Sequence, residues 1–237
     1  MGKEHYRGET LIVVKVLILV EGQTEERFIK DIITPHLEKF DVFPIPIIVT
    51  TKRVKSGADF KGGISSYTKV KREIQRLLGD TGAKAVTTML DFYALPDDFP
   101  RKKSIININC YGKVKIVEDA LVEDVNHKKF IPYLQLHEFE GLLFSLPETI
   151  AKPFADITTT EYRRLVNELQ NIRKSFKTPE EIDDNPETCP NRRIKKLIPY
   201  YRKVLYGTVI ARNIGLDTIR QECPHFNQWI EKLEALK

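Results

Sequence analysis

The chain has 237 residues, of which 41% are hydrophobic and 30% charged, and this is enough apolar material for a substantial folded core. Its 38 Lys and Arg residues against 33 Asp and Glu residues give a net charge of +5, which permits nucleic-acid binding without requiring it. The three cysteines are far apart and form no Cys-x-x-Cys pair, which argues against a cysteine zinc site and a secreted disulfide scaffold. We therefore expect a globular protein of a reducing cytoplasm.

The first candidate element in the chain is an apolar run at residues 11–20. Lys15 interrupts the run, no small-residue cleavage site follows it, and it is too short to cross a bilayer. We therefore predict a buried strand here, neither a signal peptide nor a membrane segment, and no membrane association.

Strand-like and helix-like segments then alternate along the chain. Largely apolar runs predict strands at residues 13–20, 43–49, 85–90 and 131–136, the second of them at a sheet edge because it contains prolines. Apolar residues at helical spacing predict helices at residues 24–40, 67–78 and 114–126. This alternation is typical of right-handed βαβ units, so we predict an α/β, Rossmann-like fold with a mostly parallel sheet flanked by helices.

The pattern changes after residue 147. Helices are predicted near residues 160–173, 193–206 and 224–236, and strands are not evident. We predict that residues 1–146 form the α/β domain and that residues 147–237 form a helical extension packed on the same domain.

Acidic residues follow three of the predicted strands. Glu21 ends the first strand, Asp91 ends the third, and Glu138 and Glu140 follow the fourth. The carboxyl ends of parallel strands meet at one edge of the sheet, where ligands bind. Carboxylates held close together repel one another unless a cation lies between them, and such oxygen ligands suit Mg²⁺ or Mn²⁺. Two such ions roughly 4 Å apart support phosphodiester cleavage. We therefore predict a divalent metal site here.

Each acidic residue also has a structural interpretation. Glu25 and Glu26 suit the first turn of a helix, where the helix dipole favours negative charge, and Thr24 suits its N-cap. Glu25 is accordingly a second-rank candidate for the site. Asp91 alone could form a turn, and Glu138 and Glu140 could cap or solvate a helix. Gly22 is predicted to allow a tight turn after Glu21 and to leave room for a ligand.

His137 lies between the fourth strand and Glu138. A single histidine at a strand end is commonly structural, whereas beside carboxylates it could carry protons near neutral pH. We retain it as a candidate proton carrier.

Four segments together carry a family resemblance. They are VLILVEGQTEERFI, TTMLDFYALPDDFP, PYLQLHEFEGLLFS and IGLDTIRQECPHFNQWIEKLE. The first resembles the first motif of TOPRIM domains, the module of topoisomerases, primases and overcoming-lysogenization-defect (OLD-like) nucleases. The set in this order resembles an uncharacterised bacterial TOPRIM-like family often found beside ABC-type ATPases in phage-defence cassettes.

The resemblance implies roles for individual residues. Glu21 matches the acidic residue that acts as general acid/base or metal ligand, and Asp91 matches the first aspartate of the DxD metal motif. The second aspartate of that motif falls on Tyr93, which has no carboxylate. Asp97 or Asp98, or the acidic residues of the HEFE segment, could take its place.

Two basic segments are candidate nucleic-acid contacts. Arg and Lys neutralise phosphates, and interleaved tyrosines in the second segment offer stacking faces. The alternatives are a solvated loop for the first segment and a basic amphipathic helix packed on the core for the second. The basic residues concerned are Lys52, Arg53, Lys55, Lys61, Arg192, Arg193, Lys195 and Lys196.

Two functional hypotheses follow. The first is a metal-dependent TOPRIM-like nuclease that cleaves DNA or RNA in a defence or DNA-maintenance cassette. The second is a catalytically inactive partner or regulatory subunit of an ABC-type ATPase, because the chain has no GxxxxGK[ST] motif of its own and Tyr93 interrupts DxD. A primase or topoisomerase is disfavoured, because no DNA-gate region or marked tyrosine nucleophile is evident.

Overall fold

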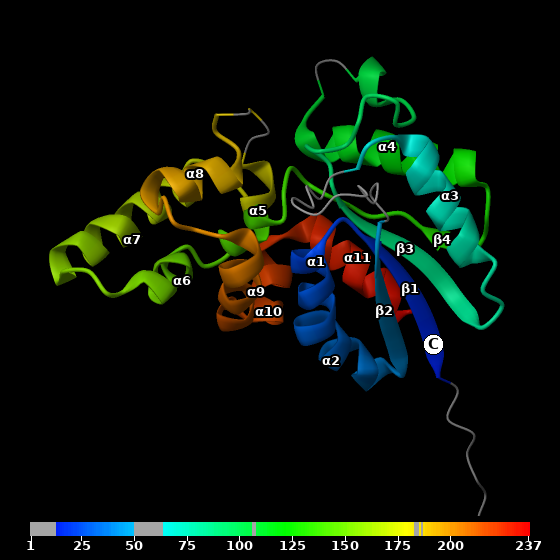
Figure 1. The fold of residues 1–237 in the computed structure, drawn as a ribbon, viewed down its shortest axis with the longest axis horizontal. Coiled ribbons are helices and arrows are strands. Elements are labelled where there is room, and N and C mark those ends of the chain that lie inside the picture. Colours follow the sequence, from blue (N-terminus) through cyan, green and yellow to red (C-terminus); the bar gives the residue numbers. More distant parts are fainter. Residues whose placement is uncertain (1–12, 50–63, 106–107, 183–184, 186) are drawn as a thin grey trace, which may run out of the picture.

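A parallel sheet with helices on both faces forms the centre of the molecule, and a group of helices extends from one end of it (Figure 1). This computed structural model describes residues 13–49, 64–105, 108–182, 185 and 187–237. The α/β fold predicted from the sequence is confirmed. Among the described residues, no helix is both long and apolar enough to cross a membrane.

The described sheet has the strand order β2-β1-β3-β4, and β5 also pairs with β3. All of these pairings are parallel, with Val14 opposite Val42 at the start of β1 and Asp91 opposite Gln135 at the end of β3. β2 is an edge strand, as its prolines predicted. The strand bounds are β1 Val14–Val20, β2 Val42–Ile48, β3 Ala83–Asp91, β4 Phe130–Ile131 and β5 Leu134–Gln135.

Alternate residues of β1 belong to two separate hydrophobic clusters. Val16, Ile18 and Val20 pack in the cluster on one face, and Leu17 and Leu19 pack in the cluster on the other. Side chains of successive strand residues point to opposite faces, so a strand covered on both sides needs an apolar residue at every position. The continuous apolar run in the sequence therefore reports the three-layer arrangement.

The first predicted helix, residues 24–40, forms with three successive geometries. It comprises α1 (Gln23–Phe28), a π-helical turn (Ile29–Ile33), α2 (Thr34–Leu37) and a final 3₁₀ turn (Glu38–Phe40). Pro35 accounts for the wide turn, because it has no N–H for an ordinary helical bond and its ring crowds the carbonyl four residues earlier. The N–H of Thr34 bonds instead to the carbonyl of Ile29.

Helices α3 (Tyr67–Leu78) and α4 (Cys110–Val125) cover the face of the sheet on which Leu17 and Leu19 lie. The bounds of α3 are those predicted. α4 begins four residues before the predicted start, because the side chain of Asn109 accepts a hydrogen bond from the N–H of Gly112 at 2.8 Å and caps the helix there.

The remaining helices include one prediction that was wrong. A single helix at residues 193–206 does not form, because Pro199 lies inside it and cannot continue a helix. Two helices, α8 and α9, take its place. The C-terminal helices are α5 Glu140–Leu143, α6 Glu148–Ala151, α7 Thr159–Lys174, α8 Pro190–Leu197, α9 Lys203–Ile214, α10 Leu216–Glu222 and α11 Pro224–Glu234.

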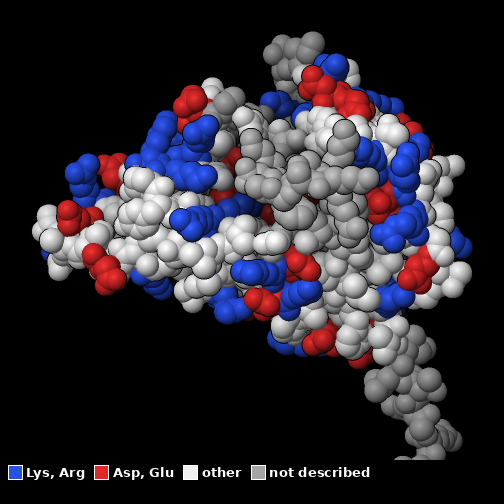
Figure 2. Space-filling model, in the orientation of Figure 1, with Lys and Arg blue, Asp and Glu red and all other residues white. Residues whose placement is uncertain are grey.

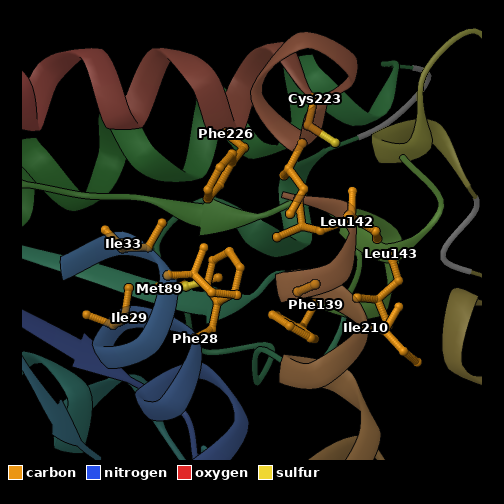
Figure 3. Close-up of a cluster of buried hydrophobic side chains, with 14 of the residues drawn as sticks. Phe28, Ile29, Ile33, Met89, Phe139, Leu142, Leu143, Ile210, Cys223 and Phe226 are labelled. Carbon is orange, nitrogen blue, oxygen red and sulfur yellow. The ribbon is translucent and has the colours of Figure 1, made fainter. Parts of the chain in front are cut away.

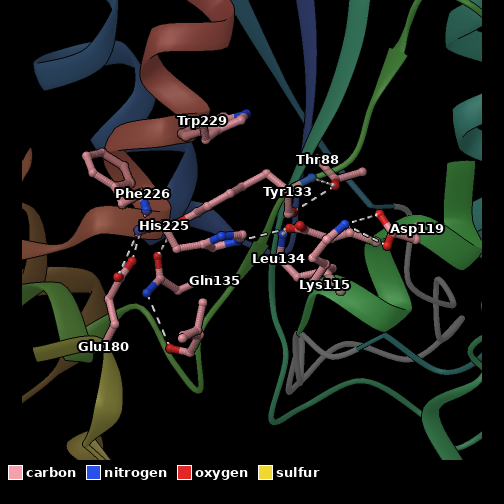
Figure 4. Close-up of polar contacts among 12 residues, drawn as sticks. Thr88, Lys115, Asp119, Tyr133, Leu134, Gln135, Glu180, His225, Phe226 and Trp229 are labelled. Carbon is pink, nitrogen blue, oxygen red and sulfur yellow. Dashed lines mark hydrogen bonds and ion pairs between the residues drawn. The ribbon is translucent and has the colours of Figure 1, made fainter. Parts of the chain in front are cut away.

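The fourth predicted strand is also interrupted by a proline. Pro132 separates β4 from β5, and the backbone there is held by side chains (Figure 4). Thr88 donates to the carbonyl of Tyr133 at 2.8 Å and accepts from its N–H at 3.0 Å. The hydroxyl of Tyr133 donates to Gln135 at 2.6 Å. These bonds fix β5, which leads directly into the HEFE segment.

A dense apolar cluster lies between α1, the HEFE segment and the C-terminal helices (Figure 3). The ring of Phe28 lies edge-on to Phe139, with 5.3 Å between centroids, and also contacts Phe226 at 5.9 Å. Phe139 is the middle residue of Glu138-Phe139-Glu140 and is fully buried. The core therefore anchors the segment that carries two of the predicted metal ligands. The boundary predicted at residue 146 stays a prediction.

Candidate functional site

The carboxyl ends of three adjacent strands bring the predicted acidic residues to one edge of the sheet. Glu21 follows β1, Asp91 ends β3, and the HEFE segment follows β5. The N–H of Phe139 donates to Asp91 Oδ1 at 2.9 Å, which ties the HEFE segment to β3. This convergence is the arrangement that the predicted parallel topology requires.

Five carboxylates gather there, and we call them the acidic cluster. They belong to Glu21, Glu25, Asp91, Glu138 and Glu140. Three of their residues are almost fully buried, with exposed fractions of 2% for Glu25, 5% for Asp91 and 0% for Glu140. Glu21 interacts electrostatically with Asp91 and Glu25, and Glu138 with Glu140. Glu25, ranked second from the sequence, is thus as deep in the cluster as Asp91.

Lys203, at the start of α9, places its ammonium group among these carboxylates. Its Nζ lies 2.9 Å from Asp91 Oδ2, 3.0 Å from Glu25 Oε1 and 3.5 Å from Glu140 Oε2. Within the described ranges, it is the one cation at ion-pair distance from the cluster. One ammonium group faces five carboxylates, so the cluster carries excess negative charge when all its members are ionised.

α9 reaches the cluster because Gly207 allows close packing. A Cβ at Gly207 would lie 3.1 Å from Phe139 Cε1 and 3.3 Å from Thr24 Cγ2, tighter than ordinary contacts. Gly207 is one turn after Lys203 and shares its helix face. The glycine therefore brings the lysine's side of the helix against α1 and the HEFE segment.

Asn191, the second residue of α8, contacts both acidic residues of the HEFE segment. Its backbone N–H donates to Glu138 Oε2 at 3.0 Å, and its Nδ2 donates to Glu140 Oε1 at 3.1 Å. The basic helix α8 is therefore docked directly on the acidic cluster.

Burial changes the acid–base properties of the cluster. Burial raises the pKa of Glu140 to about 7 against the opposing effect of Lys203, and it also raises the pKa of Asp91. Burial and the charge of Asp91 raise the pKa of Glu21. Burial alone would lower the pKa of Lys203, but Asp91, Glu140 and Glu25 outweigh it and hold that pKa well above its usual range. Lys203 therefore stays charged while the carboxylates compete for further positive charge.

Without divalent cations, we expect the free energy of unfolding to fall as the pH rises from about 5 to about 8. The pKa of Glu140 is raised above its ordinary value of 4.5, so between the two values the folded chain holds more protons than the unfolded chain. Glu140 alone should account for roughly 1–3 kcal/mol of the loss. Urea unfolding in chelator across this range measures it. The Glu140→Gln variant should give a flatter profile, and stability that rises with pH would contradict the expectation.

Two local predictions about the start of α1 were wrong. Gly22 has φ −160° and ψ −166°, an extended conformation open to any residue, and a Cβ there would make only an ordinary 3.5 Å contact with Glu25 Oε2. Gly22, and not Thr24, is the N-cap, and Thr24 is buried inside the helix. Glu25 and Glu26 do lie in the first turn, as predicted.

The other acid–base candidates lie in different surroundings. His137, the first residue of the HEFE segment, is buried with φ 58°, and its part in proton transfer stays a prediction. Asp98 accepts two hydrogen bonds from the N–H of Tyr67 at the start of α3. Asp97 is exposed and lies 3.8 Å from Lys103. In the described part of the chain, neither aspartate has a hydrogen bond or ion pair with the acidic cluster, and their place in the site stays a prediction.

The second basic segment has three exposed basic side chains and one that is partly buried. Arg192, Lys195 and Lys196 are exposed on α8, and Figure 2 shows Lys and Arg side chains gathered over this helix. Arg193 instead stacks over the ring of Phe176 at 5.4 Å and donates to Thr188. Lys196 also donates to the carbonyl of Glu187 at 2.9 Å. The first basic segment, with Lys52, Arg53, Lys55 and Lys61, lies outside the described residues.

The donor set suits Mg²⁺ or Mn²⁺, although the side chains are not arranged around an ion as they stand. Glu21 Oε2 and Glu140 Oε2 are buried and have no hydrogen-bond partner among the described atoms, and of the two only Glu140 Oε2 has a described ion pair, with Lys203 Nζ at 3.5 Å. Buried oxygens of this kind are expensive unless a cation compensates them. Within the described residues, no group of three or more His, Cys, Asp or Glu side chains forms a ready metal centre. Metal binding would therefore have to move Lys203 from its three carboxylates.

Lys203 and Asn191 were not predicted from the sequence. Lys203 belongs to the run YYRKVLYG, where its charge does not distinguish it from Arg202. Asn191 lies where the polar, proline-bearing segment TPEEIDDNPETCPNRR overlaps the second basic segment, and neither pattern marks it as a site residue. Both reach the cluster through tertiary packing, so the pattern of neighbouring residues carries no direct signal. The residue that comes nearest to such a signal is Gly207, the close-packed glycine one helical turn from Lys203.

Comparison with known proteins identifies the family. A family model described as "Domain of unknown function (DUF4276)" matches residues 20–234. The chain belongs to this family. The match begins at the last residue of β1 and ends with α11, so it includes every residue of the acidic cluster in this DUF4276 chain. No curated protein matches it.

Two solved structures are similar to this DUF4276 chain. The C-terminal region of the Burkholderia pseudomallei OLD protein has 17% sequence identity and a TM-score of 0.41, covering 94% of this chain and 99% of that chain. The C-terminal region of the Xanthomonas campestris pv. campestris OLD protein has 17% identity and a TM-score of 0.38, covering 92% and 96%.

Proposed function

We propose that the protein is a metal-dependent, TOPRIM-like nuclease that cleaves nucleic-acid phosphodiesters. The observation that carries the proposal is the charge imbalance of the acidic cluster, in which three buried and two partly buried carboxylates gather around one described ammonium group. Such a cluster is stable in ionised form only with additional positive charge, and its oxygen ligands suit Mg²⁺ or Mn²⁺.

In this proposal Glu21, Asp91, Glu138 and Glu140 hold the metal, with Glu25 as a further ligand. The bound ion would activate water and stabilise charge on the scissile phosphate. Lys203 would supply a further positive charge beside that phosphate, and His137 would carry a proton. The exposed basic residues of α8 would bind the nucleic-acid backbone. A role in phage defence or DNA maintenance is part of the proposal.

A second candidate function rests on a different observation. Lys203 already makes three ion pairs inside the cluster, so part of the negative charge is neutralised without any metal. Together with Tyr93 at the second DxD position, this favours a catalytically inactive partner or regulatory subunit of an ABC-type ATPase. In that case the cluster and Lys203 form a structural ion-pair network.

Incubation of the folded protein with plasmid DNA and with total RNA separates the two functions. The nuclease proposal predicts cleavage of at least one substrate with Mn²⁺ or Mg²⁺, and no cleavage in chelator. Cleavage that continues in chelator would contradict a metal-dependent reaction. A folded protein that neither cuts nor binds Mn²⁺ would leave the partner-subunit function.

A further inference from the structure

The N-terminus of α8 connects the acidic cluster with the exposed basic residues. Pro190 is the first residue of this helix and is buried. The N–H of Asn191 belongs to the first turn. First-turn N–H groups have no acceptor within their own helix, and the helix dipole favours a carboxylate beside them. Glu138 Oε2 accepts the bond from Asn191 at 3.0 Å. The helix thus holds Glu138 through its backbone.

The side chain of Asn191 holds the second carboxylate. Its Nδ2 donates to Glu140 Oε1 at 3.1 Å, while Glu140 Oε2 faces Lys203 at 3.5 Å. The opposite orientation of the amide would place its oxygen against a carboxylate, so the donor assignment is the favourable one. One residue therefore sets the positions of both Glu138 and Glu140, on either side of the buried Phe139.

Helix α8, which connects the acidic cluster with the exposed basic residues, is firmly packed against the rest of the fold. Ile194 is fully buried, and Arg193 is fixed by Phe176 and Thr188. The exposed Arg192 and Lys195 lie within the same two turns as Asn191. A phosphate backbone bound by these side chains acts on the same rigid helix that holds the carboxylates.

We propose that Asn191 is a positioning residue that couples nucleic-acid binding on α8 to divalent-metal binding at Glu138 and Glu140. This inference rests on the proposed nuclease function. It describes how a bound nucleic-acid substrate would regulate the metal site of the protein. Coupling between two sites is reciprocal, so a nucleic acid on α8 should tighten metal binding, and the metal should tighten nucleic-acid binding by the same factor.

Calorimetric titration of Mn²⁺ tests the proposal, with and without a phosphorothioate oligonucleotide that resists cleavage. For the wild type, we expect the oligonucleotide to raise Mn²⁺ affinity about fivefold or more. Asn191→Ala should lower Mn²⁺ affinity about 10- to 100-fold, as loss of a group that orients metal ligands typically does, and should abolish the effect of the oligonucleotide. Asn191→Leu keeps most of the side-chain volume without a donor and should behave like Asn191→Ala.

The controls separate positioning from folding. Asn167→Ala, at an exposed position of α7, should leave both affinities unchanged, and circular dichroism should show each variant folded. If Asn191→Leu restores wild-type Mn²⁺ binding, Asn191 acts only by packing and the proposal is overturned. Unchanged affinity or unchanged coupling in Asn191→Ala also overturns it while leaving the nuclease function intact. A wild type that does not bind Mn²⁺ overturns both.

Discussion

Replacing Lys203 by Met should destabilise the metal-free protein by about 2–4 kcal/mol at pH 8. Removal of one partner from a buried ion pair typically costs about 3–5 kcal/mol, and we reduce that figure because 26% of the lysine side chain is exposed. Met keeps the length of the side chain, so the loss reports the charge. At about pH 5.5 the cost should be smaller. Carboxyl groups with raised pKa values are then protonated, so they no longer need the positive charge of Lys203.

Chemical unfolding in chelator measures the effect, and added Mn²⁺ should recover much of the lost stability. Lys232→Met, at an exposed position of α11, is the matched control and should change stability by less than about 0.5 kcal/mol. An equal, small effect of both substitutions at pH 8 would show that Lys203 does not compensate the acidic cluster.

Replacing Glu21 by Gln should reduce metal-dependent cleavage about 10²–10⁴-fold. Gln has the same shape but neither binds a divalent cation as a carboxylate does nor accepts a proton near neutral pH. The folded protein should be as stable as the wild type or slightly more stable in chelator, because burial disfavours the charge of Glu21. Loss of activity with retained stability distinguishes a functional carboxylate from a structural one.

Glu26→Gln, in the first turn of α1 just after Glu21, provides the control. Glu26 pairs with Lys30 at 2.6 Å on the surface of α1 and contacts no member of the acidic cluster among the described interactions. Its substitution should leave cleavage unchanged. Wild-type cleavage by Glu21→Gln would remove Glu21 from the proposed mechanism.

The sheet and the convergence of its acidic residues follow from the sequence for a clear physical reason. A strand buried on both faces is mostly apolar, so β1 and β3 stand out, and parallel pairing then places Glu21 and Asp91 at one edge. Glu25 was ranked lower because an acidic residue in a first turn has an ordinary structural role. Its burial depends on α9, which the sequence pattern does not place against α1.

The positions of α8 and α9 were beyond prediction for a related reason. Helical periodicity continues across Pro199, and only the proline indicates that residues 193–206 cannot form one helix. The direction of the chain after such a break depends on packing between distant segments. Lys203 and Asn191 therefore reach the cluster through contacts that no local pattern encodes, whereas the three strand ends reach it through regular topology.

Calorimetric titration of Mn²⁺ into the metal-free protein is the most direct test of the acidic cluster as a metal site. We predict saturable binding to the wild type, weakened about 10-fold or more in Glu21→Gln and in Asp91→Asn and unchanged in Glu26→Gln. Folded wild-type protein without saturable binding, or equal binding by all four proteins, would contradict a metal site at the ends of β1 and β3.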